Sequence, residues 1–201
     1  MYAKDEDDGK LDEYVREAIE TLDDSAPDFT MEELLKAIKH LKNNKAAGPD
    51  RIPAEILKAC PKPVLEIILK LMNKIKNSSQ YPNAWALGIT SLLFKEGDDE
   101  DPNNYRAITV CDAISKILAI MLNDRLEVWS NDNNIVKVEQ IGFQKFSRPS
   151  DHLFVLRSLI DAHKNQGKKL YACFVDFRKA FDTVWRTGLI YKLIQYKMNI
   201  T

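Results

Sequence analysis

Apolar side chains recur at helical spacing through residues 31–78. The runs Leu34–Leu41 and Val64–Ile75 place them three and four positions apart, which predicts two amphipathic helices. Thr30 and Glu33 have the capping-box spacing that begins a helix. Prolines that suit the first turn of later helices are Pro53, Pro61 and Pro63. The second helix is expected to bury its whole apolar stripe, which is Val64, Ile67, Ile68, Leu71, Met72 and Ile75.

After Trp85 the pattern changes to short runs of strand-forming residues. Residues 89–95 and 105–110 are two such runs, and the polar residues 96–104 separate them. This arrangement predicts a β-hairpin with a long loop.

Helical spacing returns in the second half of the chain. Ile114–Trp129 predicts one helix, Ser150 is expected to cap another that runs through Ile160, and a last helix is expected from about Thr187. The predicted fold class is therefore α+β.

The most informative local sequence is an apolar run that ends in a carboxylate. Leu170–Val175 is rich in β-branched and aromatic residues and precedes Asp176, which predicts a strand buried on both faces. An ionised carboxylate at the end of such a strand needs a cation beside it. A magnesium ion that carries a phosphate meets that need. The alternative is that Asp176 caps the turn into the next helix.

Charge is distributed unevenly along the 201 residues. Residues 1–30 carry eleven acidic and three basic side chains, a net charge of −8, whereas the other 171 residues carry 19 acidic and 26 basic ones, a net charge of +7. An acidic leader therefore precedes a moderately basic body, which suits either a polyanionic partner or an ordinary solvated surface.

Composition indicates a globular intracellular protein. Hydrophobic residues make up 45% and charged residues 29% of the chain, values that exclude a disordered tail. Cys60, Cys111 and Cys173 are far apart and form no metal-binding pattern, so free buried thiols in a reducing compartment are expected. Neither a secretory signal nor a run of 18 apolar residues occurs, so no membrane is expected among the partners.

Several short blocks in a fixed order carry a family resemblance. They are Asn44–Asp50, Trp85, Phe94–Asp98, Asn104–Ile108, Ser115–Ile117, Asp124–Leu126, Gln140–Phe143, Asp151–His152 and Phe174–Asp182. Taken together, they resemble the reverse transcriptase domain of non-LTR retrotransposons, the LINE-type elements, over roughly residues 30–195. The resemblance implies the helix-rich fingers of a right-hand polymerase with a β-hairpin. Residues 1–29 would be the acidic leader, 30–166 the fingers-like region, and 167–201 the first palm strand, motif A, with its following helix.

Motif A would supply the catalytic residue. The resemblance implies that Asp176 and the backbone carbonyl of Phe177 hold Mg²⁺, in a site where two metal ions serve phosphoryl transfer. Phe181 would be the steric gate that favours deoxynucleotides, with a core aromatic as the alternative. Arg178 and Lys179 would lie near nucleotide phosphates or in solvent, and Asp182 would be a structural cap.

The predicted hairpin carries a second group of site residues. If Lys95 and Arg106 face each other across the strands, both cations point the same way. In the family such a hairpin closes over the incoming deoxynucleoside triphosphate, which Arg and Lys would bind. The alternative is that they are two ordinary surface cations.

The resemblance also implies contacts with an RNA template paired to a DNA primer. Residues expected to touch the template are Gln140, Gly142, Phe143 and Arg148, with Ser147 beside them. Gly142 is expected to permit a tight turn. The Asn43–Asp50 loop with Lys42 and Lys45 is a further candidate for RNA contact. For these residues a purely structural role is the alternative.

Departures from the family pattern limit what this chain is expected to do. The paired-aspartate hairpin of the palm is missing between Asp182 and Thr201, as is the thumb. Arg51 and Lys197 stand where the family has glycine-containing turns. We therefore expect a polymerase fragment that is inactive alone, with a non-catalytic nucleic-acid-binding relic of a retrotransposon as the alternative.

Overall fold

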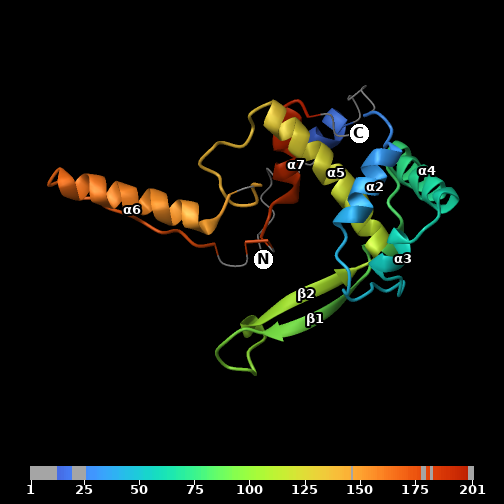
Figure 1. Ribbon diagram of the computed structural model, residues 1–201, viewed down its shortest axis with the longest axis horizontal. Helices are drawn as coiled ribbons and strands as arrows, with labels where there is room; N and C mark the ends of the chain where they lie inside the picture. The colour runs from blue at the N-terminus through green and yellow to red at the C-terminus, as the bar shows by residue number, and fades with distance from the viewer. Residues whose placement is uncertain (1–12, 20–25, 146, 178–179, 182, 199–201) are drawn as a thin grey trace.

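The computed structural model describes residues 13–19, 26–145, 147–177, 180–181 and 183–198. The elements are α2 (Met31–His40), α3 (Ala54–Lys58), α4 (Lys62–Ser78), η1 (Asn83–Ala86), β1 (Gly88–Phe94), η2 (Pro102–Asn104), β2 (Tyr105–Cys111), α5 (Ala113–Asp132), α6 (Pro149–Asn165) and α7 (Arg186–Gln195). Residues 13–19 are also helical. Figure 1 shows a helical body of α2, α3, α4 and α5, with the β1–β2 hairpin and α6 projecting from it. The predicted α+β class is confirmed.

The core lies where α2, α4 and α5 meet. Leu34, Met72, Ile117 and Met121 are almost completely buried there. Burying one such side chain stabilises the fold by about 1.5–3 kcal/mol. These four positions belong to the helical runs that the apolar spacing predicted.

The capping box at the start of α2 forms as predicted. The Thr30 hydroxyl accepts the Glu33 N–H at 3.2 Å, and the Glu33 carboxylate accepts the Thr30 N–H at 2.7 Å. Two N–H groups that the helix itself leaves unpaired are thereby satisfied.

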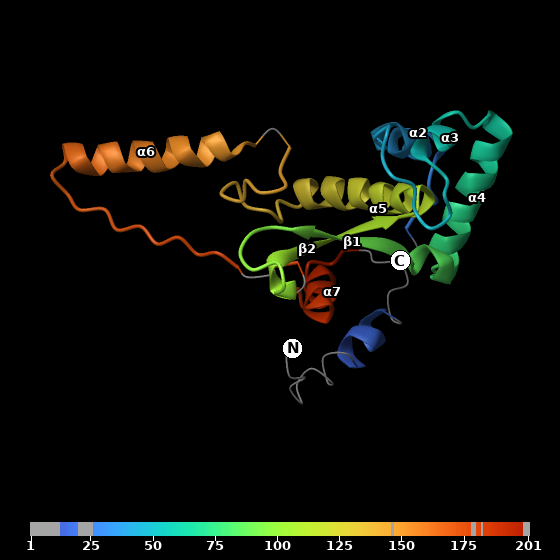
Figure 2. The same cartoon turned by 90° about the horizontal axis from the view of Figure 1, so that it is seen from below.

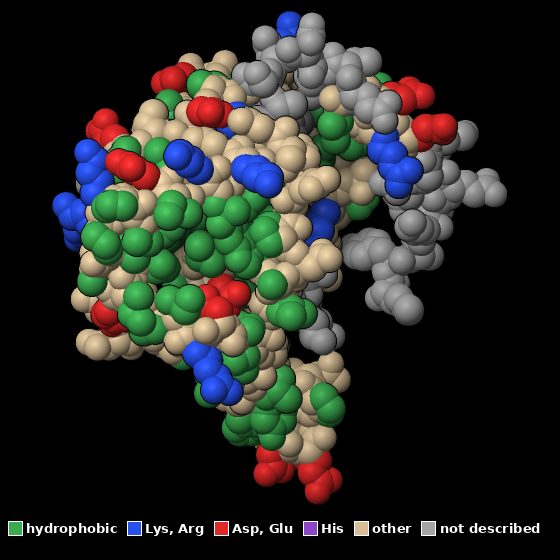
Figure 3. All heavy atoms as spheres, turned by 90° about the vertical axis from the view of Figure 1, so that its right-hand side faces the viewer, with side chains coloured by type: hydrophobic (Ala, Val, Ile, Leu, Met, Phe, Trp, Pro, Cys, Tyr) green, Lys and Arg blue, Asp and Glu red, His purple; other side chains and the backbone are tan. Residues whose placement is uncertain are grey.

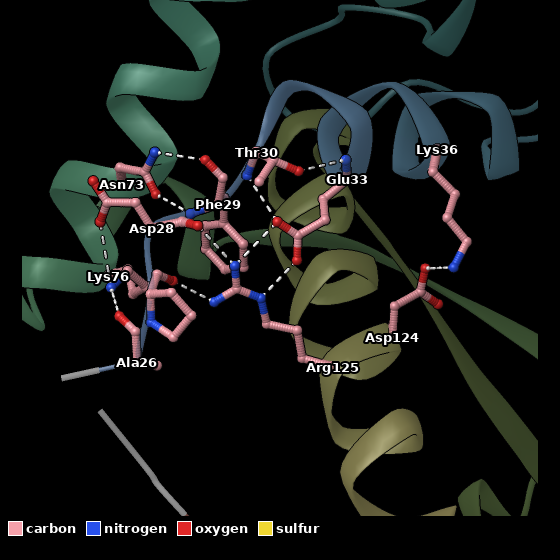
Figure 4. Close-up of polar contacts among 11 residues, drawn as sticks. Ala26, Asp28, Phe29, Thr30, Glu33, Lys36, Asn73, Lys76, Asp124 and Arg125 are labelled. Atoms are coloured by element: carbon pink, nitrogen blue, oxygen red, sulfur yellow. Dashed lines mark hydrogen bonds and ion pairs between the residues drawn. The ribbon is translucent and has the colours of Figure 1, made fainter. Parts of the chain in front are cut away.

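Arg125 of α5 ties the segment before α2 to the body (Figure 4). Its guanidinium donates to both carboxylate oxygens of Glu33, at 2.6 and 3.0 Å, and to the carbonyls of Pro27 and Asp28, at 2.6 and 2.9 Å. It also lies 4.3 Å from the ring centre of Phe29. The hydrogen bond from Arg125, more than any other contact, holds the pKa of the Glu33 carboxyl below its usual value.

Two further contacts in Figure 4 strengthen the same junction. The Asn73 amide accepts the Phe29 N–H at 2.6 Å and donates to the Phe29 carbonyl at 3.0 Å. Lys36 of α2 pairs with Asp124 of α5 at 2.8 Å. The Asp124–Leu126 block of the family resemblance therefore joins α5 to α2 and to the segment before it.

One half of the α4 stripe is exposed, which corrects the prediction that all of it is core. Ile68, Met72 and Ile75 are buried, whereas Val64, Ile67 and Leu71 are exposed. Figure 3 shows hydrophobic side chains gathered on this side of the molecule. A stripe with i, i+3, i+4 spacing is wider than the line along which two helices touch. The contact between α4 and α2 therefore covers only part of it.

The arm, meaning α6 with residues 166–177, extends away from the body (Figure 2). None of its residues is buried. Helix α6 begins after Arg148, so the predicted cap at Ser150 is wrong by two residues. Pro149 takes the first helical position, where its missing N–H is harmless, and the Asp151 carboxylate accepts the Arg148 N–H at 2.8 Å.

The predicted palm strand does not form. Residues 168–177 have no regular secondary structure, and Tyr171, Phe174 and Val175 are 86%, 82% and 75% exposed. A strand buried on both faces needs neighbouring strands and covering layers. The one sheet of the described residues, β1–β2, does not include this segment.

The three cysteines are not all buried. Cys173 is exposed and Cys60 and Cys111 are partly buried, so the expectation of three buried thiols is wrong. Along the described parts of the chain, no helix is both long enough and apolar enough to cross a membrane.

Candidate functional site

The β1–β2 hairpin is formed by antiparallel strands whose register is fully defined. Phe94 pairs with Tyr105 and Leu93 pairs with Arg106. The ladder continues one step further, because the Lys95 N–H donates to the Asn104 carbonyl at 2.8 Å. Both strands are largely exposed.

This register changes the relation between the two predicted phosphate-binding cations. Lys95 lies opposite Asn104 and not opposite Arg106, so the direct pairing expected from the sequence is wrong by two residues. Directly opposed residues share a face, and so do residues two apart on one strand. Lys95 is two residues from Leu93, the partner of Arg106, so the two cations are diagonal neighbours on one face of the hairpin.

The motif A residues lie at the C-terminal end of the arm, where the chain has returned toward the body (Figure 2), and they are exposed. The structure leaves Asp176 open to solvent, and Phe177 is 75% exposed. Asp176 neither caps a helix nor ends a strand. Arg178, Lys179 and Asp182 lie outside the described residues.

The residues present do not by themselves fit a pair of metal ions. Within the described parts of the chain, no three histidine, cysteine or carboxylate side chains come together as metal ligands. Asp176 and the Phe177 carbonyl amount to one carboxylate and one neutral oxygen. Mg²⁺ binds through one or two carboxylates together with substrate phosphates and water. This donor set is therefore at most one part of a two-metal site.

Two predicted site aromatics meet although they are far apart in sequence. The rings of Phe143 and Phe181 are in edge-to-face contact, with centroids 6.1 Å apart and an interplanar angle of 85°. Phe143 is 92% exposed and Phe181 is 79% exposed. Aromatic pairs favour this geometry. The structure thus joins the residue expected to touch the template to the one expected to select the sugar.

Phe143, and not Gly142, adopts the unusual backbone conformation of the 140–144 turn. Its φ is +62°, and the Gln144 N–H donates to the Ile141 carbonyl at 3.2 Å across the turn. A bulky residue at positive φ is strained and is often found at functional positions. The tight turn was expected at the glycine, and its strain lies one residue later.

The other predicted template residues have local roles in the structure. The Gln140 side chain donates back to the Gly142 carbonyl at 3.3 Å. Arg148 is the N-cap residue of α6, and its backbone N–H donates to the Asp151 carboxylate at 2.8 Å. Its guanidinium has no acceptor atom and takes no part in the cap.

The 48–51 turn is fixed to the base of the hairpin by Asp112. This residue connects β2 to α5, is 3% exposed, and accepts the Asp50 N–H on its carboxylate at 3.1 Å. Gly48 lies so close that an added Cβ would be 2.5 Å from the backbone nitrogen of Asp112. The family block at 44–50 therefore helps to fix where the hairpin leaves the body. No local sequence signal predicted Asp112 for this role, since the contact spans 62 residues.

The loop before this turn is held from α3. The Asn44 N–H donates to Glu55 at 2.5 Å, and Lys58 donates to the side chain of Asn43 at 2.6 Å. The hydrogen bond from the Asn44 N–H lowers the pKa of the Glu55 carboxyl. Lys42 and Lys45, which sequence reasoning considered for RNA contact, lie on this fixed loop.

Comparison with known proteins places these features in a family. The family described as Reverse transcriptase (RNA-dependent DNA polymerase) matches residues 94–201. A probable RNA-directed DNA polymerase from transposon X-element of Drosophila melanogaster is 32% identical over 165 residues, which are 81% of this chain and 18% of the relative. The RNA-directed DNA polymerase from mobile element jockey of Drosophila funebris is 27% identical over 171 residues, 83% of this chain and 18% of the relative.

A more distant relative likewise matches most of this chain but only a small part of its own length. The Pol polyprotein from type-1 retrotransposable element R1 of Bradysia coprophila is 25% identical over 179 residues, 86% of this chain and 17% of the relative. The chain thus spans less than a fifth of the length of these proteins. The family match covers more than half of the chain, so it belongs to the reverse transcriptase (RNA-dependent DNA polymerase) family, with relatives among non-LTR retrotransposons as the sequence blocks predicted.

Proposed function

We propose that this chain supplies the fingers (residues 30–166) and the start of the palm (residues 167–201) of a retrotransposon RNA-directed DNA polymerase, behind an acidic leader at 1–29. Its substrates would be an RNA template, a DNA primer and deoxynucleoside triphosphates. The observation that carries the proposal is the register of β1–β2, which supports a shared face for Lys95 and Arg106. Both residues lie within the region that matches the family.

The hairpin cations would hold the triphosphate of the incoming nucleotide. The Arg106 guanidinium can bind two phosphate oxygens at once, and the Lys95 ammonium adds a mobile point charge. Because the hairpin projects from the body, both side chains can approach a ligand from solvent (Figure 1). Charge neutralisation of this kind is a major part of catalysis in phosphoryl transfer.

Two-metal phosphoryl transfer is the chemistry proposed for the complete polymerase, to which Asp176 and the Phe177 carbonyl would contribute ligands. No acidic residue follows Asp182 in this sequence. With so few carboxylates, the chain on its own would bind Mg²⁺ weakly and would not polymerise. The second candidate function, nucleic-acid binding without catalysis, needs no metal ligands, and within the described residues no three candidate ligands come together.

The triphosphate proposal is tested by titrating the full chain with a fluorescent deoxynucleoside triphosphate. The double variant Lys95→Ala/Arg106→Ala is expected to weaken binding by about 100-fold or more, because each charge-assisted contact contributes about 1.5–3 kcal/mol. Lys62→Ala/Lys70→Ala on α4 removes the same charge elsewhere and is the matched control. Equal affinities for the two double variants would refute the role of the hairpin.

A primer-extension assay with Mg²⁺ separates the two candidate functions. The chain alone is expected to extend no primer, and extension would refute its inactivity. Binding of primed RNA without any binding of triphosphate would favour the non-catalytic candidate.

A further inference from the structure

The outer edge of β1 carries backbone groups that no other strand binds. The Lys95 N–H donates to the Asn104 carbonyl, and Leu93 pairs with Arg106. Because bonded and unbonded pairs alternate along an antiparallel ladder, the odd-numbered residues of β1 direct their N–H and C=O groups to β2. The even-numbered residues direct theirs away from β2, and these are Gly88, Thr90, Leu92 and Phe94. Within the described residues, no further strand pairs with this edge.

This edge lacks the features by which proteins protect an exposed strand. Charged residues, prolines and covering loops are the usual means of preventing a strand from pairing with another chain. β1 contains no charged residue and no proline, and all seven of its residues are exposed. β2 differs, because it contains Arg106 and three of its seven residues are partly buried. A two-stranded hairpin is only marginally stable by itself, so a further strand beside β1 would stabilise it.

We propose that β1 pairs with β1 of a second copy of this chain, antiparallel and around a two-fold axis at Ser91. The two hairpins then form one sheet in the order β2–β1–β1–β2, in which all seven residues of β1 are paired across the axis. The outward-facing residues of each copy exchange hydrogen bonds with those of the other. Because both copies use the same edge, association ends at the dimer. This contact lies outside the proposed polymerase function.

The sequence of β1 is complementary to itself in this register. Ile89 lies opposite Leu93 of the second copy, an apolar pair that the two-fold axis repeats. These two side chains are 52% and 56% exposed in the single chain. Gly88 lies opposite Phe94 of the second copy, and an aromatic ring beside a strand glycine stabilises a sheet. The dimer would therefore cover apolar surface that the hairpin leaves open to solvent.

The charges at the two ends of the hairpin favour the antiparallel arrangement. The hairpin projects from the body and has an acidic loop at its tip, which is the lowest part of Figure 3. A groove at its base is lined by Cys111 at the end of β2 and by Lys42, Lys45 and Lys116. Within the described residues, neither these lysines nor the acids of the tip form an ion pair. Antiparallel pairing brings the acidic tip of each copy beside the basic base of the other, whereas parallel pairing would bring the two acidic tips together. The acids of the tip are Glu96, Asp98, Asp99, Glu100 and Asp101.

A cysteine at position 91 tests both the partner and the register. The two copies of Ser91 would be directly opposed in a pair without hydrogen bonds, where Cα atoms are about 4.5 Å apart. That distance allows a disulfide. Ser91→Cys, in a full chain with serine in place of Cys60, Cys111 and Cys173, is therefore expected to form a cross-linked dimer under mild oxidation.

Ile108→Cys in the same background is the matched control, because Ile108 lies opposite Ser91 on β2. In the proposed sheet the two copies of Ile108 would be three strand spacings apart, about 14 Å, which is too far for a disulfide. Equal cross-linking of Ile108→Cys and Ser91→Cys would indicate random collision and would overturn the proposal. Cross-linking of Leu92→Cys in preference to Ser91→Cys would overturn the register.

Sedimentation velocity over a series of concentrations measures the dimer without a cross-link. Leu92→Lys places a charge at the outer edge and is expected to weaken dimerisation about tenfold, because the substitution occurs on both sides of the axis. Leu92→Pro removes one outward N–H, leaves the bonds to β2 in place, and should weaken dimerisation as well. Ala107→Lys, opposite Leu92 on β2, adds the same charge away from the contact and should dimerise like the parent. Circular dichroism checks that each variant keeps its secondary structure.

Three results of the sedimentation experiment would overturn the proposal. These are a monomer at every concentration, equal dissociation constants for Leu92→Lys and Ala107→Lys, and loss of the dimer in Phe174→Lys. The last result would make the exposed apolar segment of the arm the contact between copies. Lys95→Ala/Arg106→Ala should dimerise like the parent although it is expected to lose triphosphate binding, so failure of this proposal and failure of the proposed function are distinguishable.

Discussion

The helical body and the arm differ in what covers their apolar side chains. In the body, Leu34 of α2 and Ile117 of α5 are fully buried in a core to which α2, α3, α4 and α5 all contribute. In the arm, Leu153 and Phe154 are 68% and 72% exposed, and no residue is buried. The spacing of apolar residues in the sequence therefore identifies the apolar face of a helix or strand, but it does not show whether another part of the protein packs on that face.

The difference should be largest for truncation of a single leucine. Leu34→Ala is expected to lower the free energy of unfolding by about 3 kcal/mol, because it removes buried methyl groups and leaves a cavity. Leu153→Ala in the arm should change it by less than about 0.5 kcal/mol. Urea unfolding followed by circular dichroism measures both. Similar losses at the two positions would mean that the arm is packed in solution.

The body should also be less tolerant of an added methyl group. Gly48→Ala would place a carbon 2.5 Å from the backbone nitrogen and 2.6 Å from the Cα of Asp112, and is expected to lower stability by about 2 kcal/mol. Gly142→Ala meets only the flexible end of Gln140, at 3.2 Å, and should be nearly neutral. If Gly48→Ala unfolds at the same urea concentration as the parent, the turn does not clamp the hairpin.

The contribution of ion pairs to stability should depend on pH in the body and hardly at all in the arm. The pKa of Glu33 is lowered by Arg125, so this pair stabilises the folded state above the ordinary pKa of 4.5 and loses its effect as the pH falls through the lowered value. Glu33→Gln should cost about 1 kcal/mol at pH 7 and progressively less below pH 4.5.

The arm provides the control for this pH experiment. Arg157 and Asp161 pair at 2.9 Å on α6, with side chains that are 76% and 47% exposed, and such surface pairs contribute little. Asp161→Asn should leave thermal unfolding almost unchanged at either pH. An equal effect of the two substitutions would show that the Arg125 network adds nothing to the stability of the body.

The elements predicted correctly are those whose causes are local. The capping box of α2 and the prolines before α3 and α4 act within a few residues, and the hairpin follows from two strand-forming runs with a polar loop between them. The register was wrong by two because the pairing depends on the long loop between the strands, and the runs alone do not define it.

Features that depend on distant partners could not be predicted in this way. Arg125 meets Glu33 across 92 residues, and Asp112 meets Asp50 across 62. The strand expected at 170–176 requires neighbours that the described residues do not provide. Lys42, Lys45, Lys116 and Lys145 line one groove on the body, and only the fold brings Lys116 and Lys145 beside Lys42 and Lys45.

The smallest expected effects concern backbone strain, and here the arm again differs from the rest of the chain. In the arm, α6 is followed by Gly167, which has a φ of +65°. The Gly167 N–H donates to the Lys164 carbonyl and the Lys168 N–H to the His163 carbonyl, which is a Schellman motif. Helix α7 ends with the same pair of bonds, but Lys197 occupies the glycine position at φ +56°. Arg51, the last residue of the 48–51 turn of the body, has φ +58°.

Both non-glycine residues stand where the resemblance expected glycine, and the left-handed backbone explains why glycine suits those positions. A left-handed conformation costs an ordinary residue about 1–2 kcal/mol, and glycine loses about 0.5–1 kcal/mol through its greater freedom when unfolded. Arg51→Gly and Lys197→Gly should therefore each stabilise the chain by about 0.5 kcal/mol, whereas Gly167→Ala should destabilise α6. Thermal unfolding reports the first two, and amide exchange at the end of α6 reports the third. A lower melting temperature for both glycine variants would mean that the side chains of Arg51 and Lys197 make contacts that outweigh the strain they carry.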